Sequence, residues 1–232
     1  MYRVEDKYIC SERDLLILQS RVKTILDVDR YSNDCTYKVT SLYFDDYFDD
    51  HLDDSEEGVS YRKKYRIRMY NNSQEVIKLE VKYKMYNRVF KKSRIISKED
   101  ARKLISGVCI IDDDVSIDNP VSLFNIAICN DYLRPKIVVE YDRSAFTYSC
   151  GNVRITFDRN IRWSQDIDGF MCNSCAYTNL DEMSGVLEVK YDEFMPHFIA
   201  QTMETGNLTQ SSFSKYKLCR EHREVLTCQL RM

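Results

Sequence analysis

The sequence contains few residues that interrupt regular structure. Its 232 residues include only six glycines and three prolines, so we expect neither flexible linkers nor low-complexity segments. It also lacks a glycine-rich phosphate loop of the Walker type and a protein-kinase signature, which excludes the two most familiar nucleotide-binding motifs. The three histidines, at positions 51, 197 and 222, indicate no catalytic relay. We interpret His197 and His222 as surface or packing residues of predicted helices.

Long apolar runs and an excess of positive charge are missing as well. No apolar stretch reaches the roughly 18–20 residues that cross a membrane, and the N-terminus enters a strand pattern at once. We therefore expect a cytoplasmic protein that reaches the inner face of a membrane only through a separate membrane-protein partner. The 34 Lys and Arg against 37 Asp and Glu give a net charge of -3. A general nucleic-acid-binding protein would be basic, so we expect no nucleic-acid partner.

The cysteines form no recognisable framework of disulfides or metal ligands. Their number is odd, at nine, and no signal peptide precedes the first strand, so we expect reduced thiols in a cytoplasmic compartment. Cys172 and Cys175 form a single C-x-x-C pair. A structural zinc site needs two further ligands at suitable spacing, and none stands nearby. We interpret both residues as ordinary thiols.

Strand patterns dominate the chain. Hydrophobic residues make up 44% and charged residues 31%, the balance of a soluble globular protein, and the length suits a single all-β barrel domain. Most strand candidates alternate with a period of two and are rich in Val, Ile, Tyr and Thr. A polar turn at residues 71–74 joins two of them as a hairpin. The eight predicted strands cover residues 2–10, 37–46, 60–71, 75–85, 88–96, 135–147, 152–158 and 186–192.

Helical patterns lie between the strands. Ser11 is followed by Asp14, and Ser97 by Asp100, at the spacing of a capping box, and each pair precedes apolar residues at helical spacing. The other predicted helices cover residues 121–133, the segment after Phe194, and residues from about Ser214 to Leu226. The predicted class is therefore α+β, with helices packed outside an antiparallel sheet.

Several strands carry their charges on one face. One face of residues 61–69 shows Arg62, Lys64, Arg66 and Arg68, and one face of residues 77–84 shows Lys78, Glu80, Lys82 and Lys84. Like charges beside one another on neighbouring strands are destabilising, and an anionic ligand would relieve the repulsion. Such bases converging inside a closed eight-stranded barrel, with the apolar face turned outward, would form a polyanion tunnel. The alternative is a sheet whose charged face lies in water.

A tunnel of this kind has the groups that phosphate chemistry needs. Arg offers a planar fork to phosphate oxygens and Lys a mobile point charge. A divalent cation that bridges phosphate oxygens is commonly held by one or two carboxylates, which Glu5, Glu80 or Glu188 could supply. For Glu80 we favour a structural role, in which it neutralises Lys78 or Lys82.

Eight short motifs follow one another in the order found in a known family. They span residues Tyr2–Tyr8, Ser41–Asp45, Lys64–Tyr70, Leu79–Lys82, Tyr141–Phe146, Val153–Asp158, Leu187–Lys190 and Phe213–Tyr216. On these motifs the chain resembles the VTC domain, part of the triphosphate tunnel metalloenzyme or CYTH-like superfamily, from residue 2 to about residue 220. The resemblance implies one tunnel domain over residues 1–232.

The resemblance implies a polyphosphate polymerase. Such an enzyme transfers the γ-phosphate of ATP to a growing inorganic polyphosphate chain, with Mn²⁺ or Mg²⁺ as cofactor. Because the attacking phosphate is already anionic, no general base is required. The resemblance assigns catalysis to Arg66, Arg68, Lys82 and Lys215, phosphate binding to Lys7, Arg143 and Arg154, and the metal to Glu188. Lys92 and Arg94, which form a similar K-x-R pattern on another predicted strand, are further candidates for phosphate binding.

Two positions depart from the family pattern. Family members can carry a base three residues before the lysine that matches Lys215, where this sequence has Ser212. Simple alternation also places Arg143 on the apolar side of its strand, with Tyr141, so we expect it to face the tunnel only if a bulge resets the register.

Three other functions stay open at this point. Water could replace the phosphate chain as acceptor, which would make the protein a triphosphatase or nucleoside triphosphate hydrolase. The tunnel could bind polyphosphate or nucleotide without turnover, or the charged strands could belong to a structural β-domain. Because the bases repel one another without ligand, neutralising Arg66, Arg68 or Lys82 should weaken phosphate binding and leave thermal stability equal or higher.

Overall fold

The computed structural model describes residues 2–29, 36–180, 185–204, 208–211 and 213–229. Eight long strands lie close to the predicted positions. They are β1 (Arg3–Cys10), β3 (Tyr37–Asp45), β4 (Tyr61–Tyr70), β5 (Ser73–Met85), β6 (Arg88–Ile96), β7 (Arg134–Tyr148), β8 (Val153–Ser164) and β10 (Gly185–Tyr191). Three two-residue strands accompany them, namely β2 (Asp27–Val28), β9 (Thr178–Asn179) and β11 (Thr209–Gln210).

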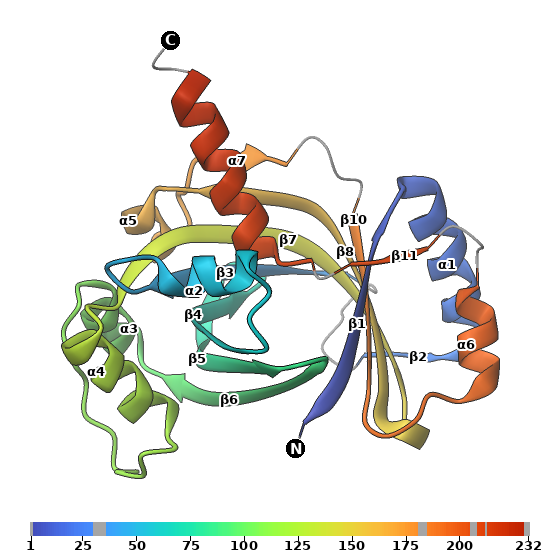
Figure 1. Cartoon of the computed structure of the whole chain (residues 1–232), viewed down its shortest axis with the longest axis horizontal. Coiled ribbons are helices and arrows are strands. Elements are labelled where there is room, and N and C mark those ends of the chain that lie inside the picture. The colour runs from blue at the N-terminus through green and yellow to red at the C-terminus, as the bar shows by residue number, and fades with distance from the viewer. Residues whose placement is uncertain (1, 30–35, 181–184, 205–207, 212, 230–232) are drawn as a thin grey trace.

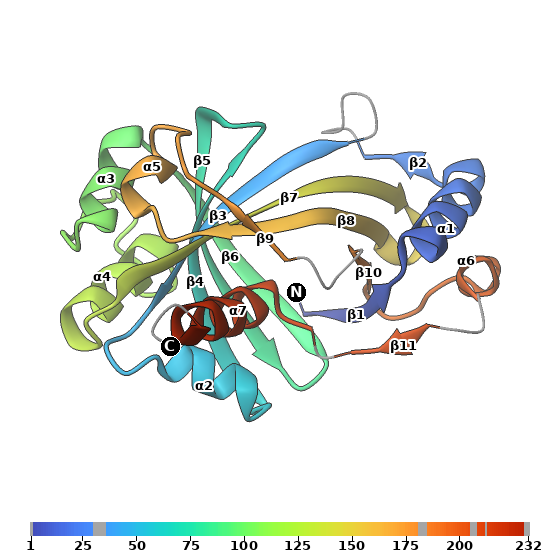
Figure 2. The ribbon, with the colours of Figure 1, turned by 90° about the horizontal axis from the view of Figure 1, so that it is seen from above.

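The eight long strands form a closed ring. They pair antiparallel in the order β7, β3, β4, β5, β6, β1, β10 and β8, and a further pairing between β7 and β8 closes the circle. Figures 1 and 2 show the strands curling around a common interior. The joint between β6 and β1 is short, with Arg3 opposite Val89 and Val4 opposite Arg88. The predicted eight-stranded antiparallel barrel is therefore confirmed.

Five of the helices match sequence predictions, and two do not. The matching helices are α1 (Glu12–Ile25), α3 (Lys98–Ile105), α4 (Pro120–Asn130), α6 (His197–Met203) and α7 (Lys215–Gln229). Ser11 and Ser97 accept from the backbone N–H groups of Asp14 and Asp100 at 3.2 and 3.0 Å, which confirms the predicted caps. The unpredicted helices are α2 (Asp50–Glu56) and α5 (Ile167–Phe170), and a 3-10 turn covers Cys150–Asn152.

The apolar faces of the strands point outward and form the main cores. Leu79 of β5 is fully buried in a cluster with Leu104 of α3 and Phe124 of α4. At the other end of the barrel, Leu18 of α1 and Phe157 of β8 belong to a second cluster with α6 (Figure 1). Each such side chain contributes about 1.5–3 kcal/mol by leaving water. Helix packing outside therefore leaves the inner face of the barrel for polar groups.

The inner face is itself apolar over part of its length. Val39 of β3 and Val139 of β7 are fully buried in a third cluster, together with Tyr216 of α7. Helix α7 packs on β7 and beside α2, as both views of the ribbon show. The barrel interior is thus filled by side chains at one part and lined by charges at another.

Strand β8 extends six residues beyond its predicted end, from Asp158 to Ser164. The pairing with β7 shifts register between Glu140 and Asp142, where β8 carries one extra residue. Asn160 lies in this shift with a positive φ of 51°, which asparagine tolerates better than most residues. The extra residue interrupts the period-two alternation of inward and outward side chains. The second half of the strand therefore cannot be recognised from the sequence pattern.

Within the described ranges, no helix is both long and apolar enough to cross a membrane.

Candidate active site

Two adjoining cavities lie within the barrel. The narrower one has a volume of about 100 Å³, and ten bases but only two carboxylates line it. The wider one has a volume of about 320 Å³. Six residues line both cavities and join them into one tunnel, namely Glu5, Arg66, Arg68, Lys82, Arg143 and Lys190. Because Arg66 and Arg68 are only 8% and 6% exposed, the interpretation that these strands hold their charges in water is wrong.

Among the described residues, Glu188 of β10 is the carboxylate that contacts the largest number of basic side chains. Its oxygens lie 2.8 Å from Nζ of Lys190, 3.2 Å from Nζ of Lys215, 3.4 Å from Nη2 of Arg143 and 3.8 Å from Nζ of Lys7. Burial raises the pKa of Glu188, but these four cations outweigh it and hold the pKa well below its usual range. The side chain is therefore a buried, ionised oxygen donor.

Glu5 of β1 forms a second carboxylate centre beside it. Its oxygens lie 2.9 Å from Nζ of Lys82, 3.1 Å from Nζ of Lys7 and 3.3 Å from Nζ of Lys190. The pKa of Lys82 is lowered to about 7. Burial is the main cause, and the positive charges of Lys7 and Lys190 lower the pKa further, whereas the negative charge of Glu5 raises it. Lys82 therefore loses its proton more easily than an ordinary lysine, although it pairs with Glu5.

Glu80 of β5 orients the arginine forks. It is fully buried, and it lies 2.7 Å from Nε of Arg66, 2.6 Å from Nζ of Lys91 and 3.8 Å from Nη1 of Arg68. Arg68 also donates to the hydroxyl of Ser41 at 3.0 Å. Both guanidinium groups are therefore held in place by protein contacts, and both arginines line the two cavities.

The partners predicted for Glu80 were wrong. Lys82 pairs with Glu5, and Lys78 lies over the ring of Tyr70 at 5.2 Å from its centroid. Neighbours two apart on one strand are about 7 Å from each other, whereas Arg66 lies directly opposite Glu80 in the pairing of β4 with β5. Cross-strand register decides the pairing, and a single sequence does not give it.

Arg143 of β7 faces the tunnel without a bulge in β7 itself, because the extra residue of the β7–β8 register shift lies on β8. The β3–β7 pairing is regular from Tyr43 to Tyr37 on β3, and Tyr141 and Arg143 both line the narrower cavity. The expectation that a register shift was needed is therefore wrong, because the inner face itself carries apolar residues farther along β7. Arg143 forms two hydrogen bonds with Asp158, at 2.6 and 2.7 Å.

Lys215 joins the same group from the start of α7. Its Nζ lies 2.6 Å from the fully buried Asp158 and 3.2 Å from Glu188. Although burial lowers the pKa of Lys215, Asp158 and Glu188 raise it above its usual value. Ser212, three residues earlier, lies outside the described residues.

The other predicted phosphate-binding residues divide into two groups. Lys7 lines the narrower cavity, and its Nζ donates to the carbonyl of Phe213 at 3.0 Å. Arg154 lines the wider cavity and donates to the hydroxyl of Tyr37 at 3.0 Å. Lys92 and Arg94 line neither cavity.

The placement of Lys92 and Arg94 corrects the sequence prediction. Lys92 pairs with Asp118 at 2.5 Å, and Arg94 pairs with Asp112 at 2.8 Å with a side chain that is 45% exposed. Both lie on the outer face of β6. Lys91, on the alternate face, is the base of this strand that lines the wider cavity, together with Val89 and Phe90. The K-x-R pattern was read in the wrong phase.

Sequence reasoning left out four bases of the narrower cavity, Arg62, Lys64, Lys84 and Lys190. The first three belong to the charged faces that the alternation reveals, so the signal was present. Lys190 stands in the motif Leu187–Lys190, two residues after Glu188, on the same face of β10. Selecting every base on the charged faces, rather than those of the family pattern alone, would have found them.

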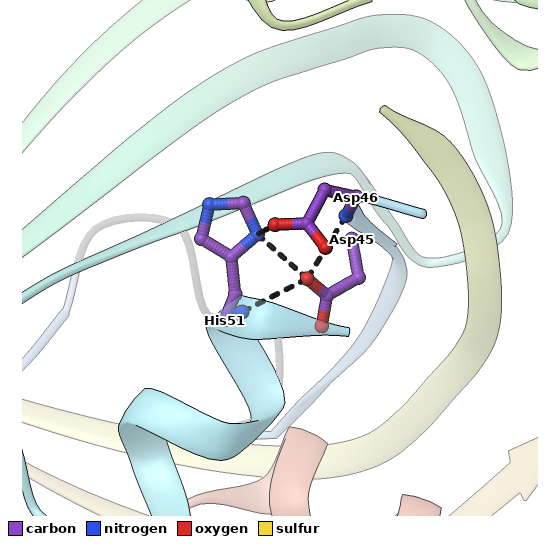
Figure 3. Close-up of side chains that lie close together, drawn as sticks. All are labelled: Asp45, Asp46 and His51. Carbon is purple, nitrogen blue, oxygen red and sulfur yellow. Dashed lines mark hydrogen bonds and ion pairs between the residues drawn. The ribbon is translucent and has the colours of Figure 1, made fainter. Parts of the chain in front are cut away.

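A separate acidic cluster lies at the start of α2. Asp45, Asp46 and His51 bring their ligand atoms together (Figure 3). One oxygen of Asp45 lies 2.7 Å from Nδ1 of His51 and also accepts the backbone N–H groups of Asp46 and His51. Its other oxygen accepts from the hydroxyl of Tyr216 at 2.5 Å. These contacts tie α2 and α7 to the end of β3, and we interpret the cluster as structural.

Solved structures share this architecture. A candidate adenylyl cyclase from Hippeastrum, described as having a dominant triphosphatase activity, is 11% identical over 95% of this chain and 95% of its own, with a TM-score of 0.58. For a candidate adenylate cyclase from Bacillus halodurans, the identity is 13% over 91% of this chain and 93% of that one, with a TM-score of 0.56. One from Vibrio parahaemolyticus is 15% identical, covering 94% and 97%, with a TM-score of 0.53. At these identities the likeness shows the fold alone.

Family membership rests on a match of the sequence itself. No curated protein sequence matches significantly. The model of the VTC domain matches residues 2–222, which is nearly the whole chain and includes all of the tunnel residues described above. The protein therefore belongs to the VTC domain family.

Proposed function

We propose that this protein is a polyphosphate polymerase, which transfers the γ-phosphoryl group of ATP to the end of an inorganic polyphosphate chain inside the tunnel. The observation that carries the proposal is the charge of the narrower cavity, where ten bases face two carboxylates. Such an excess of one sign in a small, buried space destabilises the empty protein, and a polyanion neutralises it. Membership of the VTC domain family supports a phosphate chain as that polyanion.

The transfer needs position and charge rather than a base. A terminal oxygen of the chain forms the new P–O bond, while the bond between the γ-phosphorus and the β,γ-bridging oxygen breaks and ADP leaves. Charge spreads over the equatorial oxygens of the moving group. Arg66 and Arg68, held from behind by Glu80 and Ser41, are suited to bind those oxygens. Lys82 and Lys215 add positive charge on either side.

The carboxylates fit a divalent cation of the Mg²⁺ or Mn²⁺ type. Glu5 and Glu188 both contact the ammonium groups of Lys7 and Lys190, so their oxygens face one small region. Mg²⁺ is commonly bound by one or two carboxylates together with substrate phosphates. We propose Glu188 as the main ligand and Glu5 as the second. When bound, the ion neutralises phosphate oxygens. The lysines that now hold Glu5 and Glu188 would then be free to bind phosphate.

Hydrolysis is the second candidate reaction. It differs from polymer formation only in that water replaces the terminal phosphate of the chain as acceptor. The protein from Hippeastrum, which has this fold, is described as having a dominant triphosphatase activity, and that observation keeps the alternative open. Binding of polyphosphate or nucleotide without turnover is the third.

One incubation separates the three. The purified protein is mixed with ATP and Mn²⁺ or Mg²⁺, the products are run on a gel stained for polyphosphate, and free phosphate is measured in parallel. We expect a polymer ladder with ADP. Free phosphate without polymer would identify a hydrolase, and neither product would leave a binding module. Arg68→Gln should abolish the ladder, whereas Arg94→Gln, the matched change on the outer face of β6, should keep it.

A further inference from the structure

Two exposed thiols lie in contact with each other between α3 and α4. Sγ of Cys109, in the loop after α3, lies 3.5 Å from Sγ of Cys129, in the last turn of α4, and both cysteines are free. Figures 1 and 2 show the two helices side by side at one end of the barrel. Neither cysteine lines the tunnel cavities, so the proposed polymerase reaction does not use them.

The side chain of Asn125 fixes the backbone on which this contact depends. Asn125 accepts the backbone N–H of Ile110 at 3.1 Å and donates to the carbonyl of the same residue at 2.7 Å. These two bonds hold the loop against α4 next to Cys109, whose Sγ donates to the backbone carbonyl of Asn125 at 3.8 Å. Cys129 follows Asn125 by four residues and therefore lies on the same side of α4, one turn farther along.

The other described cysteines have different surroundings. Sγ of Cys175 donates to the carbonyl of Asp166 at 3.3 Å, and Cys219 is fully buried. Within the described ranges, Cys109 and Cys129 form the one contact between two thiols. Cys172 and Cys175 form none, although their C-x-x-C spacing is the more familiar redox pattern. The structure thus brings together two cysteines that their sequence positions do not connect.

The contact is close enough for a covalent bond. A disulfide requires the two sulfur atoms to approach by a further ~1.5 Å, which rotation of two exposed side chains can supply. Partial burial and the neighbouring Cys129 raise the pKa of the Cys109 thiol. Because the thiolate is the attacking species, we expect the exchange to be slow at neutral pH and faster at alkaline pH.

We propose that Cys109 and Cys129 are a reversible redox site, which closes to an intramolecular disulfide on reaction with a low-molecular-weight disulfide such as oxidised glutathione. The thiolate of one cysteine attacks a sulfur of oxidised glutathione, so that a mixed disulfide forms and one glutathione thiolate leaves. The thiolate of the other cysteine then attacks the protein sulfur of the mixed disulfide, and the second glutathione thiolate leaves. The protein thiols give up two electrons and two protons, and one oxidised glutathione becomes two reduced molecules.

The new bond would fasten a loop that covers β6. Asp112 and Asp118 lie in this loop and pair with Arg94 and Lys92 on the outer face of the strand. Exposed ion pairs of this kind contribute little to stability. A disulfide between residues twenty positions apart restricts the unfolded chain and therefore stabilises the folded one. Oxidation should accordingly raise the thermal stability of the protein.

Peptide mapping by mass spectrometry tests the site. The reduced protein is incubated at about pH 8 with oxidised glutathione, the remaining thiols are alkylated, and the peptides are analysed without reduction. We expect a crosslink between the peptides that carry Cys109 and Cys129, which dithiothreitol removes. Oxidation should raise the melting temperature by about 5–10 °C. Cys172→Ser, a matched change of an exposed cysteine elsewhere, should keep both the crosslink and the rise.

Two further variants separate this site from general thiol oxidation. In Cys109→Ser and in Cys129→Ser, the remaining cysteine of the pair should keep glutathione as a mixed disulfide, and the rise in melting temperature should be absent. Three results would overturn the proposal, namely a mixed disulfide as the end product in the parent protein, a crosslink through another pair of cysteines, or a disulfide without the rise. None of these measurements uses a phosphate substrate, so they are independent of the proposed function.

Discussion

Arg66 and Glu80 lie directly opposite each other on β4 and β5, and their side chains meet inside the barrel with Nε of Arg66 2.7 Å from a carboxylate oxygen of Glu80. Glu80 is fully buried, so this contact removes an ionised carboxylate from water and depends on its cations to keep it there. The pair shows how the tunnel combines two tasks. A buried acid fixes the orientation of the arginines that line the cavities.

The first prediction distinguishes two bases that the sequence treats alike. Arg66→Ala would leave Glu80 buried with Lys91 as its main partner, so we expect a loss of about 3 kcal/mol or more in the free energy of unfolding. Lys82→Ala should stay within about 1 kcal/mol of the parent, because Glu5 keeps Lys7 and Lys190. Urea denaturation without ligand measures both. Equal losses would contradict this assignment of the ion pairs.

The structure thus separates residues that shared one sequence-based expectation of stability, namely Arg66, Arg68 and Lys82. From repulsion alone, neutralising either Arg66 or Lys82 should have left the protein as stable as before or more so. The cross-strand contact with a fully buried acid reverses the expectation for Arg66 and leaves it in place for Lys82.

The second prediction concerns Glu188. Glu188→Gln keeps the shape and removes the charge that four cations now share. We expect metal-dependent turnover to fall by at least about a hundredfold, since Lewis-acid stabilisation is worth several kcal/mol. Metal-free binding of tripolyphosphate should be equal or tighter, because the tunnel becomes more positive. Unchanged metal dependence of the rate, measured over a series of Mn²⁺ concentrations, would refute the assignment.

The third prediction follows from the contact between His51 and Asp45. Burial lowers the pKa of His51, but the hydrogen bond and charge of Asp45, with Asp46 and Asp54, raise it above its ordinary value. The stability that His51 contributes is therefore fully present below its ordinary pKa of about 6.5, and it is lost as the pH rises through the raised value. Although burial raises the pKa of Asp45, contacts with His51 and Tyr216 lower it, so its contribution is lost at low pH.

The melting temperatures of the parent and of His51→Gln should therefore differ most between about pH 4 and 6.5. The difference should shrink as the pH rises further. Thermal melts across this range, with Arg223→Gln as a charge-matched change on α7, provide the measurement. A difference that grows with rising pH would show that the neutral ring, rather than the ion pair, stabilises the start of α2.

Much of the fold could be predicted from alternation and capping residues. The hairpin of β4 and β5 and the caps at Ser11 and Ser97 rest on local chemistry, which a single sequence displays. Helix α2 was missed because its seven residues contain one apolar side chain, Leu52. Its first turn is fixed instead by Asp45, the last residue of β3, which accepts the backbone N–H group of His51. Tertiary contacts, rather than helical periodicity, create it.

The candidate site could be predicted in outline but not in its pairings. Alternation placed the four bases of β4, and Lys82 and Lys84 of β5, on the face that lines the tunnel, whereas Lys78 lines neither cavity. Alternation did not show which face of β6 points inward, and in the structure Lys91 lines the tunnel whereas Lys92 does not. The partner of Glu80 depends on register between strands, and the tunnel position of Arg143 depends on an inner face that is apolar elsewhere.

The most direct test of the tunnel as a phosphate site is a calorimetric titration with tripolyphosphate. It compares the parent with Lys82→Ala, which removes a base from the shared part of the tunnel, and with Lys92→Ala, which removes the same charge from the outer face of β6. We predict about a ten- to hundredfold weaker affinity for Lys82→Ala and parent-like affinity for Lys92→Ala. Full affinity in Lys82→Ala, or an equal loss in both variants, would contradict the account.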